Sequence, residues 1–200
     1  MRIPNSEYTD RPWRIHEFTE DFEVEDVWEL PTPGGPAELD RFVRGFTDGD
    51  DDKSGFVIRN LFAIRWKLGS LLGVDKESTG LGKRVQTLRS RLPDDLRNGS
   101  RGRDFETVPF VAVYQTDTEY VAELANRTVH ALMHIGWVAD GNGGYHAQMT
   151  ALVKPNGLLG KAYMTGIKPI RRTLVYPELI RSIGKNGPST PDRCPFGSPV

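Results

Sequence analysis

Four consecutive β-type segments in the second half of the chain constrain its fold more than any other feature of the sequence. They read PFVAVYQ, TEYVAELAN, RTVHALMHIGWVA and GGYHAQMTALV, and they are rich in β-branched and aromatic residues. The separators are short: TDT, the dipeptide Asn126-Arg127 and the turn-rich DGNGG. Because turns of this length join neighbouring antiparallel strands, the sequence predicts a four-stranded meander.

The same turns predict how the strands pair. With Asn126-Arg127 as a two-residue turn and further turns centred on Asp117 and Gly141, alanines from all four segments fall in one row. Four alanines abreast make a shallow trough, and because protein interiors are close-packed, either a closely docked helix or a bound molecule must fill it. The row is Ala112, Ala122, Ala131 and Ala151, and the row beside it is Tyr114, Tyr120, Met133 and Met149.

The opposite face of the predicted sheet carries ionisable side chains. These registers put Glu123 opposite His130, and they put Glu119 opposite His134, as cross-strand charge pairs. The two histidines lie ~13 Å apart along a strand at ~3.3 Å per residue, so they cannot share one metal ion. We interpret the pairs as a solvated face of the sheet, with a pH-sensitive contact between two copies of the chain as the sharper alternative.

The first half of the chain predicts strands and short helices. RIHEF and EVEDVWEL are β-like, and PTPGGP ends the second of them. Apolar residues recur at helical spacing over residues 37–46 and again from Val57 to Leu71, which predicts two helices. Residues 73–108 are polar and contain glycine, so we expect a partly mobile connector in which SRLPDDLR forms a short helical turn.

The C-terminal part predicts one long, bent helix. Apolar residues keep a helical spacing from Leu158 to Ile183, and Pro169 and Pro177 are expected to kink the helix. Residues 185–200 are rich in proline, glycine and serine, which is typical of a disordered tail. These elements together predict a single domain over residues 1–184.

Charge and cysteine content exclude several classes of protein. The formal net charge is −1 and the sequence pI is about 6.4, so no global field recruits nucleic acid or an anionic membrane. Cys194 is the one cysteine, which excludes an intramolecular disulfide. The N-terminus lacks the apolar run of a secretory signal, and no segment is apolar enough for a membrane span. We therefore expect a cytoplasmic protein without stable membrane insertion.

The sequence predicts neither a metal nor a cofactor. GDDDKSGF begins like a calcium loop at Asp50, but the position that needs a bidentate carboxylate is Leu61. We interpret the aspartates as caps of the helix that follows. The chain has no phosphate loop, no dinucleotide-binding fingerprint and no serine-nucleophile elbow.

Several longer strings carry a resemblance to a known family. NRTVHALMHIGWV, LVKPNGLLGKAYM, VYPELIRSIG and FEVEDVWELPTPGG resemble a bacterial family known only as domain of unknown function 2867. The resemblance implies an α+β fold of the helix-grip type, shared by lipid-transfer START domains, Bet v 1-like pollen allergens and polyketide cyclases. In that fold a curved antiparallel sheet wraps around a long C-terminal helix, and two short helices follow the first strands.

The cavity of a helix-grip fold lies between the sheet and the C-terminal helix. The resemblance therefore implicates the alanine trough, together with Tyr163 of the long helix and Trp66 of the second early helix. The residues expected to line the ligand site are Ala112, Tyr114, Tyr120, Ala122, Ala131, Met133, Trp137, Tyr145, Met149, Ala151, Tyr163 and Trp66.

Three functions compete on this basis. The first is a binding protein that holds a small, largely apolar or amphipathic molecule in the trough. The second is a cofactor-independent cyclase or aromatase in which tyrosine hydroxyls polarise a carbonyl group. The third is a structural protein without a ligand that forms a homodimer through the sheet face with His130, His134, Glu119 and Glu123.

Overall fold

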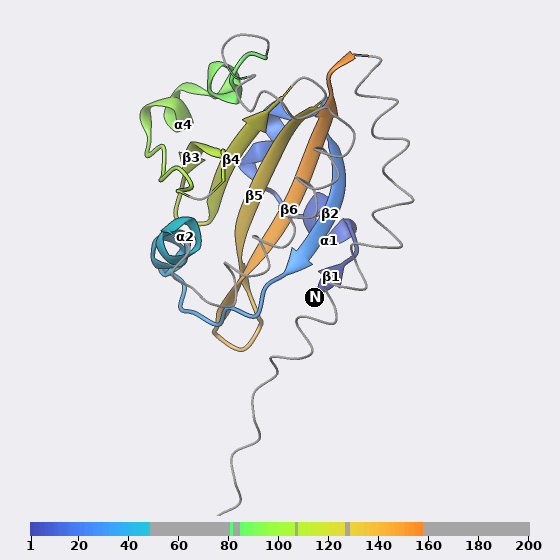
Figure 1. Cartoon of the computed structure of the whole chain (residues 1–200). Coiled ribbons are helices and arrows are strands. Elements are labelled where there is room, and N and C mark those ends of the chain that lie inside the picture. Colours follow the sequence, from blue (N-terminus) through green and yellow to red (C-terminus); the bar gives the residue numbers. More distant parts are fainter. Residues whose placement is uncertain (49–80, 82–84, 107, 127–128, 158–200) are drawn as a thin grey trace, which may run out of the picture.

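The computed structural model of the 200-residue chain describes residues 1–48, 81, 85–106, 108–126 and 129–157 (Figure 1). In these ranges it is an α+β protein. The strands are β1 (Arg2–Ile3), β2 (Glu23–Glu29), β3 (Val111–Gln115), β4 (Glu119–Ala125), β5 (Val129–Ala139) and β6 (Tyr145–Pro155). The α-helices are α1 (Ser6–Thr9), α2 (Leu39–Asp48) and α4 (Asp94–Asn98), and the 3₁₀ helices are η1 (Arg14–Phe18) and η2 (Leu88–Arg91).

The described strands form one six-stranded antiparallel sheet in the order β1-β2-β6-β5-β4-β3 (Figure 1). The last four strands run in sequence order across the sheet, which confirms the predicted meander. Its two longest strands, β5 and β6, pair along their whole length. The strand predicted from EVEDVWEL is also confirmed, because β2 pairs with the free side of β6.

The register of the β4–β5 and β5–β6 pairs differs from the prediction. Ala122 pairs with Met133, and Met133 pairs with Ala151, so a methionine stands where the predicted row has Ala131. The β4–β5 turn closes one residue later than predicted, because the Asn126 side-chain oxygen accepts a hydrogen bond from the Val129 amide at 2.9 Å. The uninterrupted row of four alanines was therefore wrong. Strands β4, β5 and β6 still present the predicted faces, because these displacements are by an even number of residues.

A register shift between Ala112 and Tyr114 turns one predicted site residue to the other face. Ala112 pairs with Ala122 as predicted, but Tyr114 pairs with Val121 instead of Tyr120. A bulge inserts one extra residue, and an odd displacement exchanges the two faces of a strand. Tyr114 is consequently separated from the other tyrosine of the predicted row.

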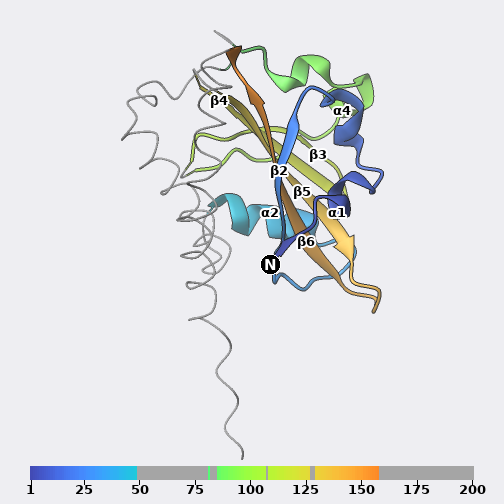
Figure 2. The ribbon, with the colours of Figure 1, turned by 90° about the vertical axis from the view of Figure 1, so that its right-hand side faces the viewer.

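Both faces of the sheet are covered by other parts of the chain. The α2 face, which we define as the face that carries Ala122 and Met133, packs against Leu39, Val43 and Phe46 of α2. The histidine face, which carries His130 and His134, is covered by α1, η1, η2 and α4, and Figure 2 shows α1 and α4 on one side of the sheet. The buried apolar residues of the histidine face are Tyr8, Trp13, Ile15, Phe22, Val27, Leu88, Leu92, Leu96, Val113, Tyr114, Val121, Leu132, Val138 and Leu152.

The segment predicted as a mobile connector is packed where the structure describes it. Leu88, Leu92 and Leu96 are at most 5% exposed and lie in the core of the histidine face. The burial of these three leucines outweighs the arginines and aspartates around them. The short helical turn predicted in SRLPDDLR is confirmed as α4. RIHEF forms η1 rather than a strand, with Ile15 fully buried.

The helix predicted over residues 37–46 is confirmed as α2. The helix from Val57 to Leu71, the long C-terminal helix and the tail over 185–200 lie outside the described residues. Within the described ranges, no helix combines the length and the apolar character needed to cross a membrane.

The packed connector gives a first prediction. Leu92→Ala removes a side chain that is 1% exposed, so the free energy of unfolding should fall by about 2–5 kcal/mol in urea denaturation. Asn98→Ala, at an exposed position of the neighbouring helix α4, is the matched control and should change it little. Equal stability of Leu92→Ala and the wild type would show that residues 85–98 do not pack on the sheet.

Candidate functional site

The α2 face is the larger apolar surface of the sheet and carries most of the residues predicted to bind a ligand. Its core combines side chains from β2 to β6 with those of α2 and of residues 105–110. The predicted site residues that the structure brings together on this face are Ala112, Tyr120, Ala122, Ala131, Met133, Trp137, Tyr145, Met149 and Ala151. Tyr114 lies on the histidine face, and Trp66 and Tyr163 lie outside the described residues.

An aromatic wall stands at one end of the α2 face. The ring of Trp137 stacks on Phe42 at a centroid distance of 5.8 Å and on Tyr145 at 6.5 Å. Gly34 makes the close approach possible, since a Cβ atom there would lie 2.7 Å from the Trp137 ring. Phe42 and Tyr145 are only half-buried, so the edges of this wall remain accessible.

Two buried polar groups at or near this wall are already paired. The Tyr120 hydroxyl donates a hydrogen bond to the Arg103 carbonyl at 2.6 Å, and burial raises its pKa. The Trp137 indole N–H donates to the Gly35 carbonyl at 2.8 Å. A phenol that is buried, bonded to backbone and hard to ionise is poorly suited to acid–base chemistry. The surface suits apolar contact.

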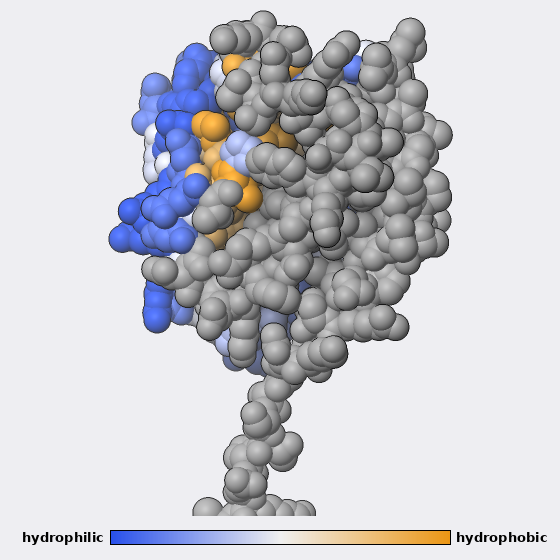
Figure 3. Space-filling view, in the orientation of Figure 1, coloured by the Kyte–Doolittle hydropathy of each residue, from blue (hydrophilic) through white to orange (hydrophobic). Residues whose placement is uncertain are grey.

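Ala151 retains part of its exposure although it lies on the inner strand β6. It pairs with Met133 on one side and with Asp26 on the other, and the Met133 and Asp26 side chains are buried. Solvent therefore reaches the floor of the sheet at this alanine. Asp26 forms an ion pair with Arg2 at 3.0 Å, which places charge beside the opening. Figure 3 shows apolar side chains of this face next to hydrophilic residues on the side where Figure 1 has α2, β3 and α4.

Glu119 of β4 connects the N-terminal segment to the histidine face. Its carboxylate accepts hydrogen bonds from the backbone amides of Arg14 and Ile15 at 2.8 and 3.4 Å. It also accepts from the Tyr114 hydroxyl at 2.8 Å and lies 3.2 Å from Nε2 of His134. Arg14 and Ile15 begin η1, so the carboxylate pairs amides that the start of a helix leaves without an intrahelical acceptor.

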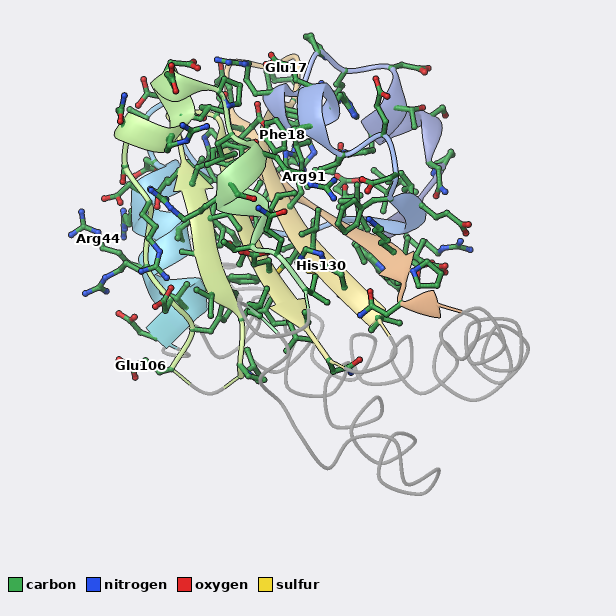
Figure 4. The ribbon with its side chains drawn as sticks, turned by 90° about the horizontal axis from the view of Figure 1, so that it is seen from above. Glu17, Phe18, Arg44, Arg91, Glu106 and His130 are labelled. Atoms are coloured by element: carbon green, nitrogen blue, oxygen red, sulfur yellow. The ribbon has the colours of Figure 1, made fainter. Side chains whose placement is uncertain are left out.

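Glu123 repeats this arrangement for the second covering segment. It lies four residues further along β4, on the same face of the strand. It accepts a hydrogen bond from the Leu88 amide at 2.9 Å and from the Thr87 hydroxyl, and it lies 2.8 Å from Nε2 of His130. Leu88 begins η2. In Figure 4, where Phe18, Arg91 and His130 are labelled, both covering segments lie on the same side of the strands. Each glutamate therefore fixes one 3₁₀ helix to the sheet.

The expectation of a solvated His/Glu face was wrong. The exposed fractions are 2% for Glu119, 1% for Glu123, 3% for His130 and 0% for His134. The two predicted pairs do form, but diagonally, because Glu119 pairs in the ladder with Gly136 and Glu123 with Leu132. Hydrogen bonds from the imidazoles and from backbone amides compensate the carboxylates for their lost hydration. Buried in this way, these side chains cannot contact a second copy of the chain.

The protonation of the Glu119–His134 pair follows from burial and hydrogen bonding. Burial raises the pKa of Glu119, but the hydrogen bonds from His134, the Arg14 amide and Tyr114 outweigh it and hold the pKa below its ordinary value. Burial also lowers the pKa of His134, against the opposing effect of Glu119. At neutral pH the carboxylate is thus ionised and the imidazole neutral, with its proton on Nε2 facing the carboxylate.

The sequence carries a signal for part of this geometry, although no residue of α2 was predicted to belong to the site. The helical spacing in residues 37–46 already put Phe42 and Phe46 on one side of a helix that must face the sheet. The pairing of Glu119 with the amide of Arg14 joins residues 105 positions apart, and no local pattern indicates it. Within the described ranges, no group of three or more His, Cys, Asp and Glu side chains is placed to hold a metal ion.

Comparison with known proteins identifies a family. The model of a family described as "Protein of unknown function (DUF2867)" matches residues 18–178. Neither the curated proteins nor the solved structures include a match to this chain. The resemblance seen in the sequence is therefore confirmed at the level of that family.

Removing the charge of Glu119 should destabilise the fold. In Glu119→Gln the amide NH₂ group meets donors where the carboxylate had accepted, so we expect the free energy of unfolding to fall by about 3–5 kcal/mol in urea denaturation. Glu17→Gln is the control, because Glu17 forms an exposed ion pair with Arg14 and should change little. A Glu119→Gln protein as stable as the control would contradict the role assigned to this carboxylate.

Acidification should destabilise the protein in two steps. The folded-state pKa of His134 lies below its ordinary value of 6.5, so the unfolded chain takes up the proton first and stability falls as pH drops below about 6.5. The pKa of Glu119 lies below its ordinary value of 4.5, so a second loss begins near that pH. The other titratable and charged residues that face this pair are His16, Tyr8 and Arg14.

Urea denaturation at a series of pH values between 7.5 and 4 measures this dependence. The His134→Gln variant should lose most of the slope between pH 7 and 5.5, while His146→Gln, at a half-buried position near the start of β6, should keep it. The same slope in both variants would mean that His134 does not titrate as a buried neutral imidazole.

Proposed function

This chain belongs to the DUF2867 family of proteins of unknown function, and from its geometry we propose that it binds a small, largely apolar or amphipathic molecule against the α2 face. The observation that carries the proposal is the partial exposure of Ala151 in the middle of an otherwise buried apolar surface. An opening that reaches the floor of a sheet, with large side chains around it, is the usual form of a small-molecule site.

The side chains around Ala151 define what such a molecule would contact. Met133, the ladder partner of Ala151, and Met149, two residues before it on β6, offer flexible, polarisable surface. The aromatic wall of Phe42, Trp137 and Tyr145 offers ring faces and edges at the end of the same surface. The ion pair of Asp26 and Arg2 supplies polarity at one border, which favours an amphipathic molecule over a purely apolar one.

The proposal includes the second wall that a helix-grip fold would provide. The sequence predicts a long helix C-terminal to β6, and in the START-like and Bet v 1-like folds that the family resemblance implies, such a helix closes the cavity over the sheet. The six-stranded antiparallel sheet and the α2 cover are compatible with this arrangement. We place the protein in the cytoplasm, which its single cysteine fits.

Binding is favoured over the two alternatives by the placement of the polar groups. A cyclase using Tyr114 and Tyr120 is disfavoured because the first hydroxyl bonds Glu119 on the histidine face and the second bonds the Arg103 carbonyl. A dimer through the His/Glu surface is disfavoured because that surface is covered by the chain itself. The partial exposure of Phe42, Tyr145 and Ala151 on the α2 face supports a ligand there instead.

Filling the opening should abolish binding. We expect the wild type to enhance the fluorescence of the apolar probe 8-anilinonaphthalene-1-sulfonate, and Ala151→Phe to weaken that binding at least about tenfold, a loss of about 1.4 kcal/mol. Asn98→Phe, at an exposed position of helix α4 on the histidine face, adds the same ring away from the α2 face and serves as the control. Equal binding by both variants would exclude Ala151 from the site.

The natural ligand is sought by mass spectrometry of the freshly purified protein, first native and then denatured. A defined small molecule released on unfolding, and absent from Ala151→Phe, would support the proposal. A protein that carries no small molecule and also fails to bind the probe would contradict it.

A further inference from the structure

A cluster of buried polar atoms lies on the histidine face, on the opposite side of the sheet from the proposed ligand site. Each of these atoms is buried and has no hydrogen-bond partner among the described residues. They are the Tyr8 hydroxyl, Trp13 Nε1, His16 Nε2, His134 Nδ1 and the Thr150 hydroxyl. Native proteins leave few such atoms unpaired, and those that remain call for a physical explanation.

The five side chains adjoin one another around His134. The Tyr8 ring meets His134 edge-on at a centroid distance of 5.3 Å and meets His16 at 4.7 Å. The Trp13 ring lies 5.1 Å from His134. Thr150 is the ladder partner of His134 on β6, so their side chains are neighbours on the same face.

The backbone of β5 makes room for this cluster. A Cβ atom at Gly136 would lie 2.6 Å from the Trp13 ring and 3.2 Å from Cε1 of His134. Glycine at this position therefore allows the indole to rest against the strand beside the imidazole. The described side chains Tyr8, Trp13, His134 and Thr150 are at most 9% exposed.

The available donors and acceptors specify the kind of molecule that could pair with them. The indole N–H can only donate, and the two hydroxyls can donate or accept. His134 already directs Nε2–H to Glu119, so its Nδ1 is an acceptor. A complementary guest must accept from the indole and donate to the imidazole. It must also be uncharged, because burial penalises any charge and the Glu119 carboxylate repels an anion.

We propose that this cluster is a second, internal binding site, which holds a small neutral hydrogen-bonding guest between the N-terminal segment and the sheet. The guest has the chemistry of a hydroxyl: it donates one hydrogen bond to His134 Nδ1 and accepts from Trp13 Nε1–H. Ordered water and a short alcohol or carboxamide share that chemistry. A metal ion does not, because no group of three metal-ligating side chains is placed for one in the described ranges.

The direction in which two variants change the midpoint of thermal unfolding tests the proposal. If a guest is bound, Thr150→Val and Tyr8→Phe each remove one of its partners, and the midpoint of thermal unfolding should fall by about 2–4 °C. If no guest is bound, each variant removes an unpaired buried hydroxyl, and the midpoint should rise or stay unchanged. Thr47→Val is the matched control, since its buried hydroxyl already donates to the Val43 carbonyl at 2.9 Å and its loss lowers the midpoint in either case.

The identity of the guest is read from the Trp13 indole proton. A rotating-frame cross-peak between that proton and water identifies ordered water, and a cross-peak to a carbon-bound proton that belongs to no residue identifies an organic guest. Raised or unchanged midpoints for both Thr150→Val and Tyr8→Phe, with neither cross-peak, would overturn the proposal. Because this site lies on the histidine face, either result is independent of ligand binding on the α2 face.

Discussion

The rest of the structure depends on two buried carboxylates on one strand. Glu119 and Glu123 each accept hydrogen bonds from a histidine of β5 and from the first amide of a 3₁₀ helix that covers the sheet. A buried carboxylate without these partners would be strongly destabilising. The burial of β4 and the docking of η1 and η2 therefore stabilise each other. Two segments far apart in sequence are in this way held on the same face of one sheet.

This arrangement divides the sheet into two faces with different chemistry. On the histidine face, Glu119 and Glu123 each pair with a histidine and are closed off from solvent, which suits a structural role, while the unpaired polar atoms around His134 suit a small neutral guest. On the α2 face, the Tyr120 hydroxyl and the Trp137 indole are bonded to backbone and the core is apolar, with solvent access at Ala151. A face whose buried polar groups are already bonded, and which is partly exposed, is more suited to binding a molecule than to catalysing its reaction.

The sequence predicts the sheet well because its strands alternate and its turns are short. It predicts the register less well, since a turn that closes at Val129 or a bulge after Ala112 has no strong sequence signal, and the bulge alone moved Tyr114 to the other face. The polar face was misread for a general reason: alternation of polar and apolar residues cannot distinguish charges in water from charges paired in a core. Only the distant partners of Glu119 and Glu123 decide between these cases.

The central claim is that the two carboxylates fix the covering segments to the sheet, and native-state hydrogen exchange measures this most directly. The amides of Arg14 and Leu88 are the ones that bond to Glu119 and Glu123. The account predicts that both exchange nearly as slowly as the amides of β4 and β5 in the sheet's interior. Exchange of these two amides at the rate of an unstructured chain, while the sheet remains protected, would contradict it.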